Sequence, residues 1–492
     1  MATNDTAMTS AFDPPGIRLG VVRGISYGLF DKPGEFVPQA HALGAGLIRV
    51  YVYWGQVEPE PGRYRWEAVD ALLAQLDGDE EVWITLCSSS PWGTRVPTDF
   101  QPQSPALDQR AYGEFVRRVV RHCAGRVRYW QCNNEPSNTD LLWAGTAAEY
   151  VAQLKTFRRA VREADPAAAV VLGGCGYDVF SSEPGSPARR FFDHVASTGR
   201  DAFDLFSVHL CGDPASVPLY LDTARQFMRA HGYLKPLVVG EHAGPQPFEF
   251  PDATAVMQQV FAAAFAEPPP CQSTGDLAAR AGQDTPERRA MTALYARMDG
   301  LPPTLQMFME GCPAELEAKR HRISCRQLVM RTLLALAGGV HRTAYWNLAP
   351  EYPGPVDHHQ MMHLLIGKLP LLGYEDGSLG FRHPTADAFA LLAGQLAGAR
   401  AVTRADTGGP PTLHAFEVDR AGRGPLLVLW DHRDAFRGED EPPVTVTWPW
   451  AAATATVSDV FGRTRTVHGR GGRIRLPVSG TPLFVAESYS RT

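Results

Sequence analysis

The sequence lacks the features that mark membrane, nucleic-acid-binding and secreted proteins. No stretch approaches the ~20 apolar residues that a membrane helix requires. No run of lysine and arginine occurs and the formal net charge is −6, so we expect no nucleic-acid and no membrane partner. The opening residues, MATNDTAMTSAFDPPG, have neither the basic start nor the apolar core of a signal peptide, so a cytoplasmic protein is expected.

Cysteine is scarce and scattered. None of the eight cysteines forms a CxxC pattern or a Cys/His ligand pair, so no metal site is expected. Four of them fall in or at the end of predicted strands, where a free thiol packs as a small apolar group. This usage is typical of a reduced, intracellular chain. A disulfide between Cys271 and Cys312 stays open at this point.

The 492 residues show a regular alternation of short apolar runs and longer amphipathic segments. Most of the apolar runs are continuous, as in parallel strands that are covered on both faces. Between them, residues 106–125 and 146–166 have helical spacing and helix-ending signals. Eight such units predict an α/β fold, a (β/α)8 TIM barrel. The expected strands are 23–29, 47–53, 81–87, 126–132, 168–174, 204–210, 235–241 and 342–348.

The unit between the seventh and eighth strands is irregular. Residues 242–341 are about twice the usual length of such a unit and include the Pro-rich AEPPPCQ. Helices are expected at 285–299 and from Pro313 to about Ala337. We expect an insertion over the mouth of the barrel, where loops shape substrate access; an insertion far from the mouth is the alternative.

The pattern changes again near residue 400. Short alternating strands with Gly, Pro and Asp turns predict a C-terminal antiparallel β-sandwich domain. The expected division is therefore a catalytic barrel with its insertion at 1–399 and a β-sandwich accessory domain at 400–492.

The stretch QCNNEPSNTD, residues 131–140, places amides and a carboxylate where the fourth strand stops. Pro136 has no N–H and cannot continue a strand, so Asn134 and Glu135 belong to its carboxyl end. The seventh strand ends in the same way, at Glu241. Because the carboxyl ends of barrel strands meet at one rim, both carboxylates are expected at one mouth.

Paired carboxylates with neither a metal signature nor a phosphate-binding loop favour cleavage of a glycosidic bond. One carboxyl must be protonated to assist the leaving oxygen, and the other ionised to attack the anomeric carbon. A metal-dependent barrel hydrolase would place His-x-His near the first strand, and RGISYGLF has none. The expected partner is a glycoside or oligosaccharide substrate, and no cofactor is expected.

Three sequence motifs together resemble clan A glycoside hydrolases. NEP closes the fourth strand, GE closes the seventh, and WGQVEPEPGRYRWEAVD, residues 54–70, follows the second. Members of this clan are retaining (β/α)8 enzymes, and the barrel-plus-sandwich layout is most similar to family 39, which holds β-xylosidases and α-L-iduronidases. The resemblance implies a retaining glycosidase with Glu135 as acid/base and Glu241 as nucleophile.

The same resemblance implies roles for neighbouring residues. Asn134 matches the asparagine that touches the sugar 2-hydroxyl, and Arg49 matches the arginine beside the nucleophile. His209 matches the histidine of the sixth strand. Trp346 matches the tryptophan of the eighth strand, which forms part of the sugar-binding floor.

The sequence departs from the clan at Cys211, where many members have a tyrosine that hydrogen-bonds the nucleophile. Tyr177 is a candidate source of that hydroxyl, and Trp54 and Trp92 are candidate wall residues of neighbouring sugar subsites. We expect the histidines of DHHQMMH, residues 357–363, in a loop beside the site rather than at a metal. Cys211 also supports the alternative function, a catalytically silent carbohydrate-binding or scaffold barrel.

Overall fold

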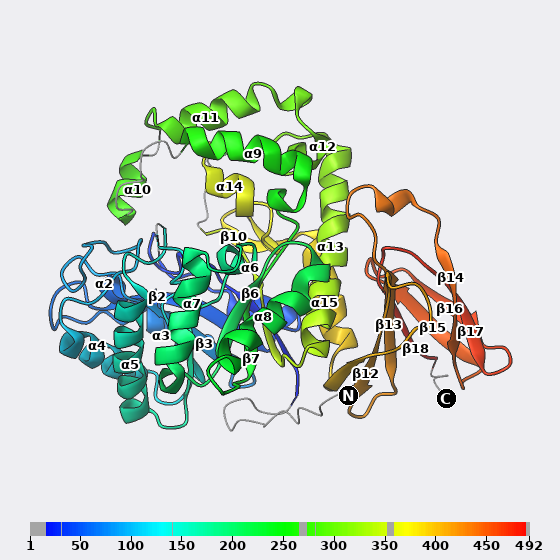
Figure 1. The fold of residues 1–492 in the computed structure, drawn as a ribbon, viewed down its shortest axis with the longest axis horizontal. Helices are drawn as coiled ribbons and strands as arrows, with labels where there is room; N and C mark the ends of the chain where they lie inside the picture. The colour runs from blue at the N-terminus through cyan, green and yellow to red at the C-terminus, as the bar shows by residue number, and fades with distance from the viewer. Residues whose placement is uncertain are drawn as a thin grey trace.

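The computed structural model describes residues 16–30, 32–139, 141–264, 273–280, 282–351 and 359–488. Its first eight strands are β1 (Arg18–Val22), β2 (Leu47–Tyr53), β3 (Glu81–Cys87), β4 (Tyr129–Cys132), β5 (Ala169–Val171), β6 (Phe206–Leu210), β7 (Leu237–His242) and β8 (Arg342–Trp346). They form one parallel sheet in the order β5-β4-β3-β2-β1-β8-β7-β6. Parallel bridges Val171–Leu205 and Cys175–Val208 join its edges, so the sheet closes into the expected (β/α)8 barrel (Figure 1).

The strand predictions hold for seven of the eight strands, with β2 and β3 matching residue for residue. The prediction of a first strand at 23–29 is wrong, because β1 is Arg18–Val22 and residues 25–29 form a turn. Gly24 and Gly28 have φ of 106° and 70°. These left-handed conformations suit a glycine turn and not a strand.

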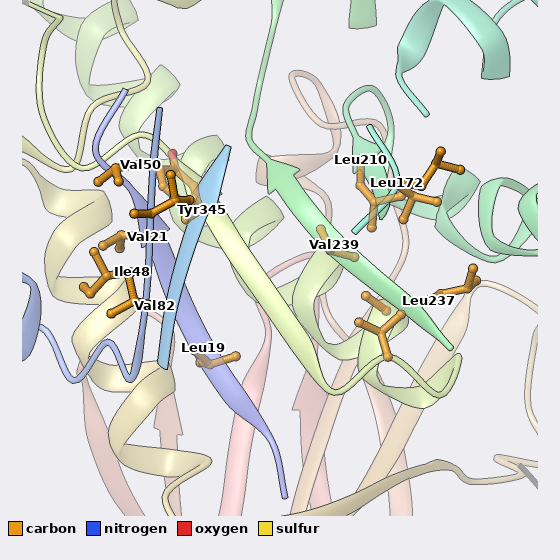
Figure 2. Close-up of a cluster of buried hydrophobic side chains, with 14 of the residues drawn as sticks. Leu19, Val21, Ile48, Val50, Val82, Leu172, Leu210, Leu237, Val239 and Tyr345 are labelled. Atoms are coloured by element: carbon orange, nitrogen blue, oxygen red, sulfur yellow. The ribbon is translucent and has the colours of Figure 1, made fainter. Parts of the chain in front are cut away.

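Side chains that point outward from the strands form the main core. Val21, Ile48, Val50 and Val82 are fully or almost fully buried in the layer between the barrel and its helices (Figure 2). Inward-facing side chains form a second cluster inside the barrel, which includes Tyr51. The alternation follows from the two-residue period of a strand, and it leaves the strand ends to carry polar groups.

Helices surround the barrel, and several of the longer ones begin at a capping side chain. Thr146 Oγ1 accepts from the N–H of Glu149, and Glu149 Oε2 accepts from the N–H of Thr146 at 2.8 Å, a capping box. Asp108 caps the helix Gln109–His122, because its side chain accepts a hydrogen bond from the N–H of Arg110. The barrel helices include α1 (Val37–Ala42), α2 (Trp54–Val57), α3 (Glu67–Leu73), α4 (Gln109–His122), α5 (Ala147–Ala164), α6 (Tyr177–Phe180), α7 (Pro187–Thr198), α8 (Val217–Arg229), α13 (Ala314–Ala337) and α15 (Pro384–Gln395).

The segment after β7 forms a helical layer with a core of its own. Met257, Met291, Leu294 and Phe308 are buried there together. The layer follows the carboxyl end of β7 and lies above the barrel in Figure 1. Cys271, and with it the open question of a bridge to Cys312, lies outside the described residues. The helices of the layer are α9 (Pro251–Ala264), α10 (Thr274–Arg280), α11 (Pro286–Tyr295) and α12 (Pro303–Gln306).

The C-terminal part is antiparallel, as expected. A six-stranded sheet has the order β11-β12-β13-β18-β15-β16, and β14 pairs with β17. Two of its strands, β11 and β16, have mostly exposed side chains. Among the described helices, none combines the length and apolar character that a membrane span needs. The strands are β11 (Ala399–Arg404), β12 (Leu413–Arg420), β13 (Leu426–Asp431), β14 (Val444–Pro449), β15 (Thr454–Asp459), β16 (Thr464–His468), β17 (Arg473–Val478) and β18 (Leu483–Glu487).

A short helix and a hairpin lie between β8 and α15, and the sequence predicted neither of them. The helix is α14 (Met361–Ile366), and the hairpin pairs β9 (Leu372–Glu375) with β10 (Ser378–Arg382).

Candidate active site

Glu135 stands on a tight turn at the carboxyl end of β4. Asn133 and Glu135 have φ of 58° and 40°, a left-handed backbone that residues other than glycine adopt at a cost in energy. Buried polar contacts hold the turn: Ser88 N–H donates to Asn133 Oδ1 at 2.7 Å, and Asn134 N–H donates to Gln103 Oε1 at 3.0 Å. The turn thus fixes the position of Glu135 at the rim.

Glu241 at the end of β7 is held by two side chains of β2. Arg49 Nη1 lies 2.6 Å from Oε1 of Glu241 and also donates to the Gly240 carbonyl at 2.9 Å. Tyr51 Oη donates to the same Oε1. The second oxygen, Oε2, is not engaged by these donors.

The surroundings of Glu241 favour its ionised form. Burial pushes its pKa upward, but the charges of His209 and Arg49 and the hydrogen bonds from Tyr51 and Arg49 outweigh burial. The pKa of Glu241 is therefore lowered from its usual range. Burial raises the pKa of Tyr51 well above its ordinary value, so its hydroxyl keeps the proton that it donates.

His209 lies between the two carboxylates. Its Nδ1 is 2.6 Å from Oε1 of Glu135 and 3.5 Å from Oε2 of Glu241. One oxygen of each carboxylate and a ring nitrogen of His209 all lie within 4.8 Å of one another. Carboxyl groups about 5–5.5 Å apart are characteristic of retaining glycosidases, whereas inverting ones leave a wider gap for water.

Glycine at Gly174 and Gly240 makes room for the imidazole of His209. A Cβ added at Gly174 would lie 2.1 Å from Nε2 of His209, and one at Gly240 would lie 3.0 Å from the same atom. No larger residue fits at Gly174 without moving the ring. The two glycines therefore set where the histidine stands.

Arg49 also connects Glu241 at the end of β7 with Asn134 after β4. Its Nη2 donates to Asn134 Oδ1 at 2.9 Å, which leaves the amide NH2 as the group available to a ligand. Trp346 lies edge-to-face with Tyr51, at 6.3 Å between ring centroids, and joins Asn347 through a cis peptide bond. The structure thus brings Asn134, Arg49, His209 and Trp346 together around Glu135 and Glu241.

The structure places two predicted wall residues elsewhere. Trp54 has no exposed surface, stacks on Phe115 of α4 at 5.3 Å and donates to Glu58 Oε2 at 2.8 Å. Trp92 packs against Trp54 and donates to the Glu58 carbonyl at 2.9 Å. Both rings belong to the layer between the barrel and its helices, so we no longer assign them to sugar subsites.

Tyr177, the predicted source of a hydroxyl for the nucleophile, stands at the start of α6, and Tyr51 supplies that hydroxyl instead. The sequence reasoning missed Tyr51, although it shares the inward face of β2 with Arg49 two residues earlier. The two-residue spacing of Arg49 and Tyr51 was the signal in the sequence that could have identified Tyr51.

Asp178 was also missed. A Cβ at Gly176 would lie 2.9 Å from Glu135 Oε1 and 3.0 Å from Asp178 Oδ1, so the two carboxyl groups are close neighbours. Ser137 donates to Asp178 Oδ2 at 2.6 Å. Burial and the charge of Glu135 raise the pKa of Asp178 to about 6. No sequence spacing links residues 135 and 178.

Two groups of side chains among the described residues have the spacing of metal ligands. One is Glu135, His209 and Glu241, but the guanidinium of Arg49 already places a positive charge 2.6 Å from Glu241, which opposes a second cation there. The other is a partly exposed group of His41, Asp77 and Glu80. In DHHQMMH, residues 357 and 358 lie outside the described residues, and His363 lies in helix α14 rather than in the predicted loop, where it pairs with Glu310 at 3.1 Å.

Fold and site together define a (β/α)8 protein with a carboxylate pair at its mouth. A family 39 glycoside hydrolase from the gut symbiont Bacteroides cellulosilyticus WH2 aligns with a TM-score of 0.61 and 13% identity, covering 96% of this chain and 81% of that one. A monomeric β-xylosidase from Caulobacter crescentus CB15 aligns with a TM-score of 0.58 and 12% identity, covering 97% and 98%. An endo-β1,6-glucanase aligns with a TM-score of 0.56 and 11% identity, covering 97% and 92%.

No protein-family model and no curated protein matches the sequence. At identities this low, the likeness to solved structures establishes a shared fold. The resemblance to clan A, which came from the strand-end motifs, and to family 39, which came from the barrel-plus-sandwich layout, is confirmed at that level.

Proposed function

We propose that this protein is a retaining O-glycoside hydrolase in which Glu241 is the nucleophile and Glu135 the acid/base. The observation that carries the proposal is the approach of one oxygen of each carboxylate to within 4.8 Å at the carboxyl ends of β4 and β7. The glycoside hydrolases that share the fold support the same reaction class.

The reaction has two balanced steps. Glu135 gives its proton to the glycosidic oxygen while Oε2 of Glu241 attacks the anomeric carbon, so the glycosidic bond breaks as a sugar–Glu241 ester forms. Glu135, now ionised, takes a proton from water, and the resulting hydroxide attacks the same carbon. The ester breaks, Glu241 leaves as a carboxylate, and the sugar keeps its anomeric configuration.

The side chains around Glu135 and Glu241 assist the reaction in different ways. Arg49 and Tyr51 hold Oε1 of Glu241, which aims Oε2 and keeps the carboxylate ionised. The NH2 group of Asn134 is positioned to donate to a sugar hydroxyl, a contact that strengthens as positive charge develops on the ring. Trp346 offers a flat aromatic surface beside Tyr51 for the apolar face of a sugar.

Nucleophile and acid/base substitutions test the assignment. On an activated aryl glycoside, Glu241→Gln is expected to lose nearly all turnover. Glu135→Ala is expected to regain turnover when azide is added, with a glycosyl azide of retained configuration as product. Glu249→Gln is a matched control, because Glu249 is buried after β7 but bonded to Arg331 and Gln327. Wild-type rates in both catalytic variants would refute the assignment.

The alternative, a catalytically silent binding or scaffold barrel, drew its support from Cys211. With Tyr51 donating to Glu241, the missing tyrosine at that position no longer favours it. A screen of aryl and natural glycosides separates the two functions, since a scaffold would turn over none of them.

A further inference from the structure

A third carboxylate lies beside the proposed acid/base. Asp178 is the second residue of α6, the short helix that follows β5, and Ser137 donates to its Oδ2 at 2.6 Å. Ser137 stands two residues after Glu135, beyond the end of β4. The hydrogen bond therefore joins Asp178 to the same turn that carries Glu135.

Gly176 shows how closely the two carboxyl groups approach each other. A Cβ added there would lie 2.9 Å from Oε1 of Glu135 and 3.0 Å from Oδ1 of Asp178. The backbone of Gly176 is extended, with φ of −97°, so its conformation does not require glycine. Glycine is needed here because any side chain would occupy the small space that both carboxyl groups face.

Little positive charge surrounds Asp178 in the described part of the chain. The groups that act on it there are Glu135, a serine hydroxyl and backbone N–H groups, with no lysine or arginine among them. Arg189 donates to two backbone carbonyls instead. Burial and the charges of Asp178 and Glu135 raise the pKa of the Cys175 thiol, which keeps its proton. From β6, His209 contacts the other acid, with Nδ1 2.6 Å from Oε1 of Glu135.

The charge of the proposed nucleophile is offset by a guanidinium. A retaining glycosidase needs its acid protonated while its nucleophile is ionised, and a negative charge close to the acid favours that state. Arg49 Nη1 lies 2.6 Å from Oε1 of Glu241, which weakens the effect of that charge on Glu135. Asp178 supplies a negative charge next to Glu135 without such a partner among the described residues.

Titration of the two neighbouring acids has the sign that this function needs. Burial and the charge of Glu135 raise the pKa of Asp178 to about 6, against the effect of the Ser137 hydrogen bond. Two acids this close titrate as a pair, so the proton lost near pH 6 belongs to both of them. Isolated carboxyl groups would both be ionised above about pH 4.

We propose that Asp178 is a positioning residue whose charge keeps the catalytic proton on Glu135 until the glycosidic oxygen takes it. The proposal rests on the proposed glycosidase function. Asp178 acts through Glu135 and transfers no proton to substrate itself. Once Glu135 has given up its proton, two neighbouring carboxylates repel each other, which favours uptake of a proton from water in the second step.

The pH–rate profile of Asp178→Asn tests the proposal. Without the neighbouring charge Glu135 should lose its proton more readily, so the basic limb of kcat/KM should move to lower pH by about one unit. The substrate is the phenyl glycoside of whichever sugar is turned over, because its poor leaving group needs the acid. At pH 7 kcat/KM should fall about tenfold, and on the acidic side of the profile it should match the wild type. A basic limb at the wild-type pH in the folded variant would overturn the proposal.

An activated leaving group separates this effect from general damage to the site. The 2,4-dinitrophenyl glycoside needs little help from an acid, so its kcat/KM should change less than about twofold in Asp178→Asn. Asp213→Asn is the matched control, an acid after β6 whose side chain is 54% exposed and lies 3.7 Å from His432. It should leave both profiles unchanged. Equal losses on the two substrates, or the same shift in the control, would overturn the assigned role.

A double-mutant cycle measures the coupling without turnover. At pH 8 Asp178→Asn should raise the urea midpoint in the wild-type background and raise it less in the Glu135→Gln background, because the amide does not repel Asp178. An equal rise in both backgrounds would show that the two charges are not coupled and would overturn the proposal. Failure of the proposed function is recognised separately, because no aryl glycoside would then be cleaved.

Discussion

Tyr51 on β2 donates a hydrogen bond to Oε1 of Glu241 on β7, across the interior of the barrel. In many clan A enzymes a tyrosine after the sixth strand has this function, and this chain has Cys211 there. A tyrosine hydroxyl also reaches Glu241 here, from the strand that supplies Arg49. The environment of the carboxylate is thus preserved although its donor comes from a different strand.

Tyr51→Phe should reduce kcat about 10- to 100-fold, since a hydrogen bond to a charged group is worth about 1.5–3 kcal/mol. The lost donor helps to lower the pKa of Glu241, so the acidic limb of the pH–rate profile should move to higher pH. Tyr53→Phe is the matched control, because Tyr53 is buried on the same face of β2 and bonds neither carboxylate. Equal effects of the two substitutions would contradict the role of Tyr51.

Gly174→Ala should reduce the proposed glycosidase activity about 100-fold through His209. The new Cβ would stand 2.1 Å from Nε2 of His209, so the ring must move. A misplacement of a catalytic group by about 1 Å costs about 100-fold in rate. Gly394→Ala, in α15 with open space around it, should leave kcat/KM unchanged. A thermal melt of both variants separates displacement of His209 from unfolding; full activity in folded Gly174→Ala would contradict the prediction.

Asp178→Asn should stabilise the protein at neutral and higher pH. The folded state raises the pKa of this carboxyl from 3.8 to about 6, so its contribution is fully present below pH 3.8 and is lost as pH rises through about 6. At pH 8 the wild type holds a partly buried carboxylate beside Glu135, and the amide removes that charge. A gain of about 1–2 kcal/mol is expected, less than the full shift implies because the group is partly exposed.

Denaturant melts at pH 4 and pH 8 measure this effect. The gain from Asp178→Asn should be present at pH 8 and small at pH 4. Asp299→Asn, an exposed carboxylate in the helical layer, should change stability little at either pH. A gain of equal size at both pH values would exclude titration of Asp178 as its cause.

Incubation with EDTA followed by desalting should leave kcat/KM unchanged. The two carboxylates carry the proposed reaction themselves, and Arg49 already supplies positive charge 2.6 Å from Glu241. A loss of activity that Mg²⁺, Ca²⁺ or Zn²⁺ restores would contradict the proposed mechanism.

The local patterns predicted the barrel well because its strands are continuous apolar runs with clear ends. They failed at β1, where RGISYGL has the composition of a strand but two glycines in left-handed turns. Residues attached to a strand end, such as Glu135 and Glu241, could be placed because parallel strands share a rim. Asp178 could not, because its approach to Glu135 depends on how the loop after β5 folds back.

The predictions for Trp54 and Trp92 show what the position of a residue near a strand end does not determine. Trp54 and Trp92 follow the ends of β2 and β3, yet Trp54 turns outward and packs against Phe115 of α4, and Trp92 packs against Trp54. Sequence position gives the end of the barrel at which a side chain lies. It does not give the direction in which the following turn points that side chain.

The helices that follow β7 bury Met257, Met291 and Phe308 among themselves and with α13, separately from the apolar layer around the barrel. Substitutions in this small core therefore need no compensating change in the strands that carry Glu135 and Glu241. Changes within this helical layer can therefore accumulate while the two carboxylates keep their positions at the ends of β4 and β7.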